Sequence, residues 1–237
     1  MDADIPDGRL ARTLPGSART RAVELGIVGI RSVLVITTLA AVIATFADTA
    51  SRGPVNPFNF FGYFTIQSNL LGVAVLGATA VLGVLGRQQG LVLQLARASI
   101  TTYLIVVALI YNTLLTGLGG GVELAWANTI MHVVFPLYCL LDWLLVSDRR
   151  PLPFRFLWVV EVYPIVWCAV ILLRGASDGW VPYPFFNPSN GYGSVLLYVL
   201  GIAVTFIVVG AAVFAASRLQ LFGLAERLGT QVGDVAG

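Results

Sequence analysis

The stretch SVLLYVLGIAVTFIVVGAAVFAA, residues 194–216, decides the fold of this chain. It contains 23 residues and not one Asp, Glu, Lys, Arg or His. About 20 consecutive apolar residues are enough for an α-helix to cross the hydrocarbon core of a bilayer. The stretch therefore predicts a membrane-spanning helix.

Five further apolar runs of comparable length precede it, and the composition agrees with a membrane location. Of the 237 residues, 57% are hydrophobic and 11% are charged, whereas a soluble domain is typically about 25% charged. This excludes a soluble enzyme, a disordered chain and a nucleic-acid-binding protein. The runs are continuous and not alternating, which favours helices over barrel strands. We expect an all-α polytopic membrane protein, a six-transmembrane-helix bundle, with spans at residues 23–47, 58–85, 99–117, 125–146, 154–173 and 194–216.

The distribution of arginine predicts how the bundle is oriented. Cytoplasmic segments of membrane proteins carry an excess of basic residues. The opposite side holds only Arg52 and, at the end of a span, Arg174. We therefore expect both termini in the cytoplasm, with a disordered tail at residues 1–21 and a short tail at 218–237. The arginines on the cytoplasmic side are Arg9, Arg12, Arg19, Arg21, Arg87, Arg97, Arg149, Arg150, Arg155, Arg218 and Arg227.

The loop GASDGWVPYPFFNPSNGYG, residues 175–193, lies on the outer side in this topology. Its aromatic and proline residues make it too apolar to extend freely into water. We expect it to lie on the membrane surface or to cap the bundle. It is either a lid that admits lipid or a plain interfacial connector, and the sequence leaves both open.

Polar residues on three of the predicted spans fall at one depth in the outer half of the membrane. Thr65 and His132 are each seven residues from the outer start of their span, or about 10 Å at 1.5 Å per residue. Asn112 is five residues before an outer end, about 8 Å deep. Polar groups inside a bilayer are costly and usually face the bundle interior. The three side chains are therefore expected to converge.

A hydroxyl group and an imidazole at one depth are typical of a nucleophile and its base. His132, the single histidine of the chain, would take the proton of Thr65 and later protonate the leaving group. Asn112 and Asn128 are candidates to orient the imidazole or to donate to an oxyanion. Interhelical hydrogen bonding that only stabilises packing is the competing interpretation. Ser68 and Asn69, on the same helical stripe as Thr65, are further orienting or oxyanion candidates.

A second polar layer is predicted on the cytoplasmic side. Arg31 and Glu161 lie eight and seven residues into spans that both run outward from the cytoplasm, so the two could pair, and Asp142, near the inner end of its span, could join them. A buried ion pair that fixes helix packing is the expected arrangement. A proton or ion path is the alternative. The two cysteines, Cys139 and Cys168, lie inside apolar runs, which disfavours a disulfide framework and a cysteine metal site.

Two segments resemble a known family. FGYFTIQSNLL around Thr65 and NTIMHVVFPLYCLLDWLL around His132 are similar to the androgen-induced and androgen-dependent family of integral-membrane hydrolases. The stretch YPIVW…LLRG…GWVPYPFFNP, residues 163–188, is similar to the bacterial six-transmembrane relatives of that family. The resemblance covers roughly residues 25–216.

The resemblance implies hydrolysis of fatty acid esters of hydroxy fatty acids by a threonine and a histidine inside the membrane, at positions matching Thr65 and His132. We therefore expect an intramembrane lipid ester hydrolase in a bacterial plasma membrane, acting on a lipid-like acyl ester among membrane lipids. No metal or organic cofactor is implied, and the oligomeric state stays open. The alternative is a non-catalytic lipid- or small-molecule-binding membrane protein, such as a sensor or transporter.

Overall fold

The structure, a computed structural model, describes residues 15–115, 124–146 and 148–219, and within these ranges it consists of helices and short connections without a strand. Six helical segments within them are long and apolar enough to cross a membrane, so the predicted set of six spans is confirmed. The α-helices are α1 Pro15–Arg52, α2 Pro57–Phe60, α3 Phe64–Val84, α4 Leu91–Ile110, α5 Ala125–Thr129, α6 Phe135–Leu145, α7 Val159–Ser177 and α8 Tyr192–Ala216. The π-helical segments η1 Tyr111–Leu115 and η2 Ile130–Val134 and the 3-10 turns η3 Phe154–Phe156, η4 Pro184–Phe186 and η5 Pro188–Asn190 complete the fold.

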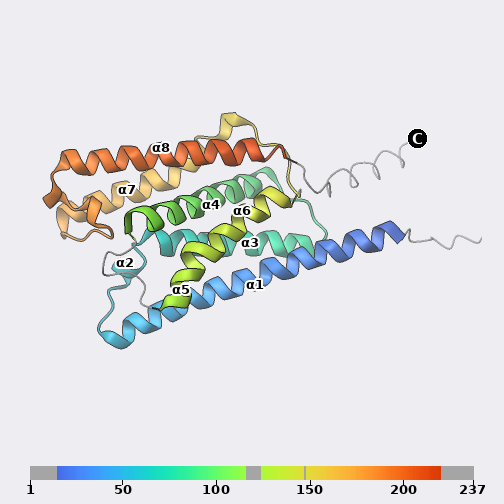
Figure 1. The fold of residues 1–237 in the computed structure, drawn as a ribbon, viewed down its shortest axis with the longest axis horizontal. Helices are drawn as coiled ribbons and strands as arrows, with labels where there is room; N and C mark the ends of the chain where they lie inside the picture. The colour runs from blue at the N-terminus through green and yellow to red at the C-terminus, as the bar shows by residue number, and fades with distance from the viewer. Residues whose placement is uncertain (1–14, 116–123, 147, 220–237) are drawn as a thin grey trace, which may run out of the picture.

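The helices form an elongated bundle around α4 (Figure 1). Helix α4 contacts α3, α6, α7 and α8, while α1 packs along α3 and against α5 and η2. One end of the bundle carries α2 and the turns η4 and η5, and we call it the α2 end (left in Figure 1). At the other end α1 begins and α8 ends, and we call it the terminal end.

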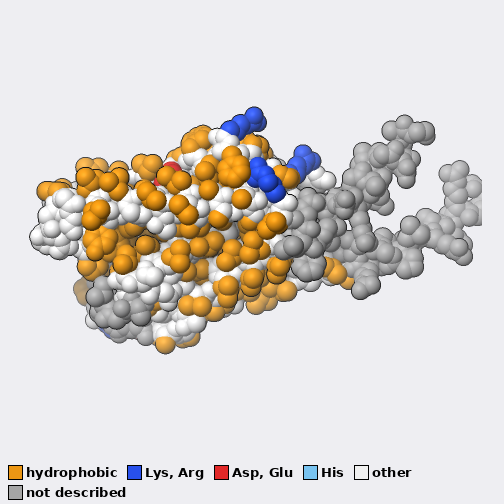
Figure 2. All heavy atoms as spheres, turned by 45° about the horizontal axis from the view of Figure 1, so that its top comes forward, with side chains coloured by type: hydrophobic (Ala, Val, Ile, Leu, Met, Phe, Trp, Pro, Cys, Tyr) orange, Lys and Arg blue, Asp and Glu red, His pale blue; other side chains and the backbone are white. Residues whose placement is uncertain are grey.

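The outer surface of the bundle is apolar, as a lipid-facing surface must be. Figure 2 shows hydrophobic side chains over most of the visible face, with arginine side chains gathered toward the terminal end. Helices α7 and α8 carry many of the exposed apolar residues, among them Leu173, Leu197 and Val208. A soluble protein rarely exposes a contiguous apolar patch of this extent.

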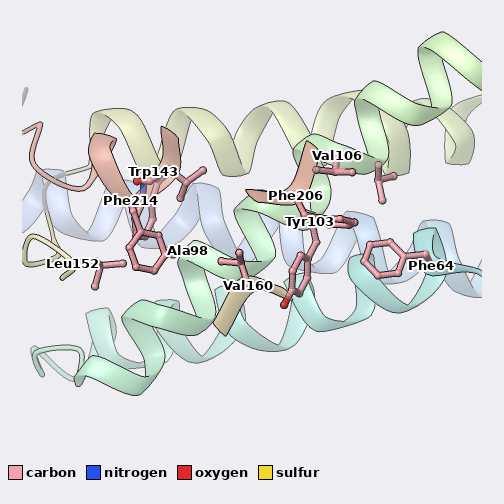
Figure 3. Packing of buried hydrophobic residues seen from close by; sticks show 11 residues of the cluster. Phe64, Ala98, Tyr103, Val106, Trp143, Leu152, Val160, Phe206 and Phe214 are labelled. Carbon is pink, nitrogen blue, oxygen red and sulfur yellow. The ribbon is translucent and has the colours of Figure 1, made fainter. Parts of the chain in front are cut away.

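The largest group of buried apolar residues lines α4 on the side of α7 and α8. Three of its aromatic members, Phe64, Tyr103 and Phe206, pack edge to face, with ring centroids 5.7 to 5.9 Å apart (Figure 3). Gly210 allows α8 to approach α7, because a Cβ atom there would lie 2.9 Å from Val160. Close helix contacts at small residues are the usual packing device inside membranes.

Three boundaries differ from the sequence-based prediction, and one of them is the start of the third span, which lies at Leu91 and not at residue 99. Helix α1 begins at Pro15, so the expected disordered tail is wrong for residues 15–21; residues 1–14 and 220–237 lie outside the described ranges. Proline suits the first turn of a helix, and no second proline interrupts the chain before Arg52. The run at 58–85 is not one helix: it divides into α2 and α3, with a break at residues 61–63.

Candidate functional site

The break between α2 and α3 places Thr65 in the first turn of a helix. Gly62 lies in the break, and its carbonyl oxygen accepts a hydrogen bond from Trp167 Nε1 at 2.9 Å. The first amides of a helix have no intrahelical partner, and they carry the positive end of the helix dipole. Thr65, the second residue of α3, therefore combines a side-chain hydroxyl with a backbone N–H group that has no partner within its own helix.

The Thr65 carbonyl group ties α3 to the segment that carries His132. Ser68 Oγ donates to the Thr65 carbonyl oxygen at 3.1 Å, and Asn69 Nδ2 donates to the same oxygen at 2.8 Å. Asn69 Nδ2 also donates to the Met131 carbonyl oxygen at 3.3 Å. The two bonds from Asn69 Nδ2 hold the carbonyl oxygens of Thr65 and Met131 within about 6 Å of each other. They also occupy the amide donors of Asn69.

His132 lies in the π-helical segment η2, which ends two residues before Pro136. Proline has no N–H group, so it cannot supply the helical hydrogen bond to the carbonyl oxygen of His132, four residues earlier. The ladder widens locally, and the Phe135 N–H donates to the Ile130 carbonyl oxygen, five residues back. Such π turns inside α-helices are frequent at functional sites.

The imidazole of His132 is buried and held on two sides. Its Nδ1 atom lies 3.1 Å from the Asn128 carbonyl oxygen. A carbonyl oxygen accepts only from a protonated nitrogen, so Nδ1 carries the hydrogen and Nε2 presents its lone pair. The ring lies on Tyr111, with ring centroids 3.8 Å apart and planes inclined by 23°. Asn128 Nδ2 donates to the Tyr111 hydroxyl at 2.6 Å, which links both supports.

The Asn112 side chain does not turn toward Thr65 and His132, so the predicted convergence of the three side chains is wrong for Asn112. Asn112 is exposed, and its Nδ2 donates to the Ala108 carbonyl oxygen of its own helix at 2.7 Å. Neighbouring residues of a helix point about 100° apart. Tyr111, one position earlier, therefore takes the inward position that depth alone assigned to Asn112.

Tyr183, from the loop before η4, packs onto the start of α3. Its hydroxyl oxygen accepts a long hydrogen bond, 3.4 Å, from the Thr65 backbone N–H. Burial raises the pKa of the Tyr183 phenol, so this group stays a neutral O–H donor at ordinary pH. The loop at residues 175–193 thus caps the bundle at its α2 end, which was one of the two expected arrangements.

A cavity of about 100 Å³ lies beneath this cap, between α4, α7 and α8. Thr65, Tyr111, Tyr183 and Glu161 are among its polar lining residues, and the remaining wall is almost wholly apolar. Ile165 also lines the cavity and is 60% exposed on the outer face of α7. The cavity therefore reaches the surface that faces lipid.

The two predicted catalytic residues share one region, but they are not in contact through hydrogen bonding. Within the described ranges, no hydrogen bond joins Thr65 to His132. Tyr111 lines the cavity and stacks on His132, while His132 is not among the cavity-lining residues. Tyr111 thus separates the imidazole from the cavity in this conformation.

At the terminal end Arg31 forms a buried ion pair with Asp142, the residue that was expected only to join a pair between Arg31 and Glu161. Arg31 Nε donates to Asp142 at 2.9 Å, and both side chains are buried. Arg97 Nη2 contacts the same carboxylate at 2.7 Å, and Asp148 bridges both arginines at 2.8 Å. The four charges form a closed network, which lowers the cost of burying each one.

Glu161 does not join this network, and that part of the prediction is wrong. Its Oε1 atom is buried and has no hydrogen-bond partner within the described part of the protein. Matching depth was the only reason to pair Glu161 with Arg31, and depth does not fix the direction of a side chain around its helix. Glu161 faces the cavity instead.

Four residues of these two sites were not among the site residues predicted from the sequence. Arg97 precedes the predicted span at 99–117, yet it lies inside α4. Asp148 follows the end of a span and carried no depth signal. Tyr111 and Tyr183 gave no polar signal because aromatic residues are common in spans and at membrane surfaces.

Comparison of the chain with protein-family models, with curated proteins and with solved structures gives no match. The family resemblance of the two motifs therefore stays a prediction.

Proposed function

We propose that this protein is an intramembrane lipid ester hydrolase in which Thr65 is the nucleophile and His132 the base. The observation that carries the proposal is the position of Thr65: it lines an apolar cavity that reaches the lipid-facing surface at Ile165. An acyl ester dissolved in the bilayer can enter such a cavity laterally. The tautomer of His132, with Nε2 as the unprotonated nitrogen, supports its role as base.

In the proposed reaction His132 Nε2 takes the proton of the Thr65 hydroxyl as Oγ1 attacks the ester carbonyl carbon. The tetrahedral intermediate collapses, the C–O bond to the alcohol breaks, and His132 protonates the leaving alkoxide. Water, deprotonated by His132, then attacks the threonyl ester, releases the fatty acid and restores the Thr65 hydroxyl. For these steps His132 and Tyr111 must shift together, as a stacked pair, so that Nε2 reaches the Thr65 hydroxyl.

We assign two hydrogen-bond donors to the oxyanion of this reaction. One is the Thr65 backbone N–H, which points at the Tyr183 hydroxyl in this conformation, and the other is the Tyr183 O–H itself. Both lie at the positive end of the α3 dipole, where negative charge is stabilised. The Nδ2 groups of Asn69 and Asn128 and the Ser68 hydroxyl already donate elsewhere. We assign these three residues a positioning role.

We further propose that the terminal end of the bundle faces the cytoplasm of a bacterial cell and that the site lies in the outer half of the plasma membrane. Arginine side chains gather at the terminal end, in agreement with the positive-inside rule (Figure 2). A cysteine introduced at Asn187, after replacement of Cys139 and Cys168, should react with an impermeant maleimide added outside the cells. Protection of that cysteine until the cells are lysed would contradict this orientation.

A fluorophosphonate probe tests the hydrolase proposal. The purified protein in detergent should form a phosphonate adduct that mass spectrometry locates on Thr65. Thr65→Ala and His132→Ala should abolish the adduct. Thr79→Ala is the matched control, because Thr79 is a buried threonine on the same helix and is absent from the cavity wall; it should label as the wild type does.

The second candidate function is binding of a lipid or small molecule without catalysis. The observation that favours it is the position of Tyr111 between His132 and the cavity. A folded protein that binds a lipid ester saturably, but gives neither adduct nor ester hydrolysis, would overturn the hydrolase proposal in favour of this one.

A further inference from the structure

Glu161 is a carboxyl group that the proposed reaction does not use. It lies near the start of α7, inside the span Phe154–Ser177, and it lines the same cavity as Thr65. Its Oε1 atom is buried without a hydrogen-bond partner in the described residues. An ionisable residue within a membrane span usually marks a functional site, because the bilayer penalises it heavily.

The helix register gives the depth of Glu161 relative to Thr65. The Tyr163 hydroxyl donates to Gln67 Oε1, which places these two residues of α7 and α3 side by side. The two helices run in opposite directions. Glu161 lies two residues from Tyr163 toward the terminal end, and Thr65 lies two residues from Gln67 toward the α2 end. At 1.5 Å per residue, the two groups are about 6 Å apart along the bundle axis.

We propose that Glu161 is the acceptor for a hydroxyl group on the substrate chain, so that the preferred substrate is an acyl ester carrying that hydroxyl at least about four carbon–carbon bonds from the ester carbonyl. This inference rests on the proposed function for the position of the ester. A chain that enters at Ile165 with its carbonyl carbon at Thr65 extends along the apolar wall toward Glu161.

A hydroxyl group is the chemistry that fits this site. A carboxyl group accepts a hydrogen bond in either protonation state, whereas a buried acceptor left unpaired costs stability. A donor from the ligand removes this cost. A cationic donor would have to carry a full charge into an apolar cavity inside the membrane, which is far more expensive. A hydroxyl group adds the hydrogen bond without the free-energy cost of burying a charge.

The first experiment measures selectivity in hydrolysis. The substrates are 4-nitrophenyl decanoate and its 3-hydroxy and 6-hydroxy derivatives, assayed with the wild type, Glu161→Gln and Glu161→Leu. In the wild type, kcat/KM for the 6-hydroxy ester should exceed that for the plain ester about tenfold, with no such gain for the 3-hydroxy ester. Glu161→Gln keeps an acceptor and should keep part of the preference, whereas Glu161→Leu should lower the ratio to about one.

The second experiment measures binding without catalysis and so separates the two proposals. N,N-dimethyldecanamide and its 6-hydroxy derivative resist hydrolysis, and calorimetry in detergent gives their affinities. The wild type should bind the 6-hydroxy amide about tenfold more tightly than the plain amide, and Glu161→Leu should bind both equally. If no ester is hydrolysed but this pattern appears, the hydrolase proposal fails and the role of Glu161 stands. Equal affinities in the wild type, or a preference that survives in Glu161→Leu, would overturn the role of Glu161.

Discussion

The imidazole ring of His132 lies nearly parallel on the phenol ring of Tyr111, with centroids 3.8 Å apart. Each ring belongs to a π-helical segment, η1 and η2, and the two segments come from different spans. A π turn changes the direction of the side chains that follow it. The stack is therefore a product of two local distortions, and it fixes the plane of the imidazole.

If this stack positions the imidazole for proton transfer, its loss should slow catalysis more than binding. We expect Tyr111→Leu to lower kcat for ester hydrolysis about tenfold or more, with a smaller change in KM. Tyr111→Phe keeps the stack and removes the hydroxyl group that accepts from Asn128 Nδ2, so it should retain most of the activity. An unchanged or higher kcat in Tyr111→Leu would show that Tyr111 only shields His132.

The hydroxyl group of Tyr183 should contribute to catalysis if it stabilises the oxyanion. Removing one such donor costs about a hundredfold in kcat in enzymes that use an oxyanion hole. We expect a loss of this size in Tyr183→Phe, with KM nearly unchanged because the ring and its packing remain. Tyr192→Phe is the control, since Tyr192 is 70% exposed at the start of α8. Equal kcat values for the two variants would remove Tyr183 from the oxyanion site.

The sequence predicted the spans well because the bilayer leaves a long apolar run few alternatives to a helix. It also placed Thr65 and His132 in one region. It failed where rotation about a helix axis mattered: Asn112 points outward, and Glu161 faces the cavity and not Arg31. Pro136 indicates a distortion at His132, but residue composition does not indicate the π turn at Tyr111 or the break at Gly62, and these set the direction of the site residues.

The buried charge network at the terminal end should be essential for stability. Asp142 pairs with both Arg31 and Arg97, so Asp142→Leu leaves two buried guanidinium groups short of a partner. Breaking a buried ion pair from one side typically costs 3 to 5 kcal/mol. We expect a loss of about this size in the unfolding free energy, measured by denaturant titration in detergent micelles.

The exposed ion pair between Asp48 and Arg52 provides the control for this network. Exposed pairs contribute about 0 to 1 kcal/mol. Asp48→Asn should therefore change the unfolding free energy by less than about 1 kcal/mol. Similar losses in Asp48→Asn and Asp142→Leu would contradict a special role for the buried network.

Asp148 makes the same network sensitive to acid. Although burial alone would raise the pKa of Asp148, the guanidinium groups of Arg97 and Arg31 outweigh it and lower this pKa from 3.8 to about 2. A carboxyl group with a lowered pKa stabilises the fold above its unfolded value and loses this contribution as the pH falls through the folded value. We expect the melting temperature to fall between about pH 4 and pH 2. Asp148→Asn should be less stable at pH 7 and should lack this part of the pH dependence.

Gly62 sets the break that exposes the first amides of α3, and a side chain there should disturb the site. A Cβ atom at Gly62 would lie 2.6 Å from the Trp180 ring and 2.8 Å from the Phe58 carbonyl oxygen. The backbone atom cannot yield as a flexible side chain can, so Gly62→Ala should displace the start of α3. Overpacking of this kind typically costs 1 to 3 kcal/mol. We expect such a loss of stability together with at least a tenfold drop in labelling of Thr65 by the fluorophosphonate probe.

Gly53→Ala is the matched substitution, because no atom lies within 4 Å of a Cβ atom at Gly53. It should leave both the unfolding free energy and the labelling rate close to those of the wild type. A Gly62→Ala variant that loses stability but labels Thr65 at the wild-type rate would show that the break supports the fold and not the nucleophile. Such a result would separate the packing of Trp180 from the chemistry at Thr65, because both depend on Gly62 in the structure.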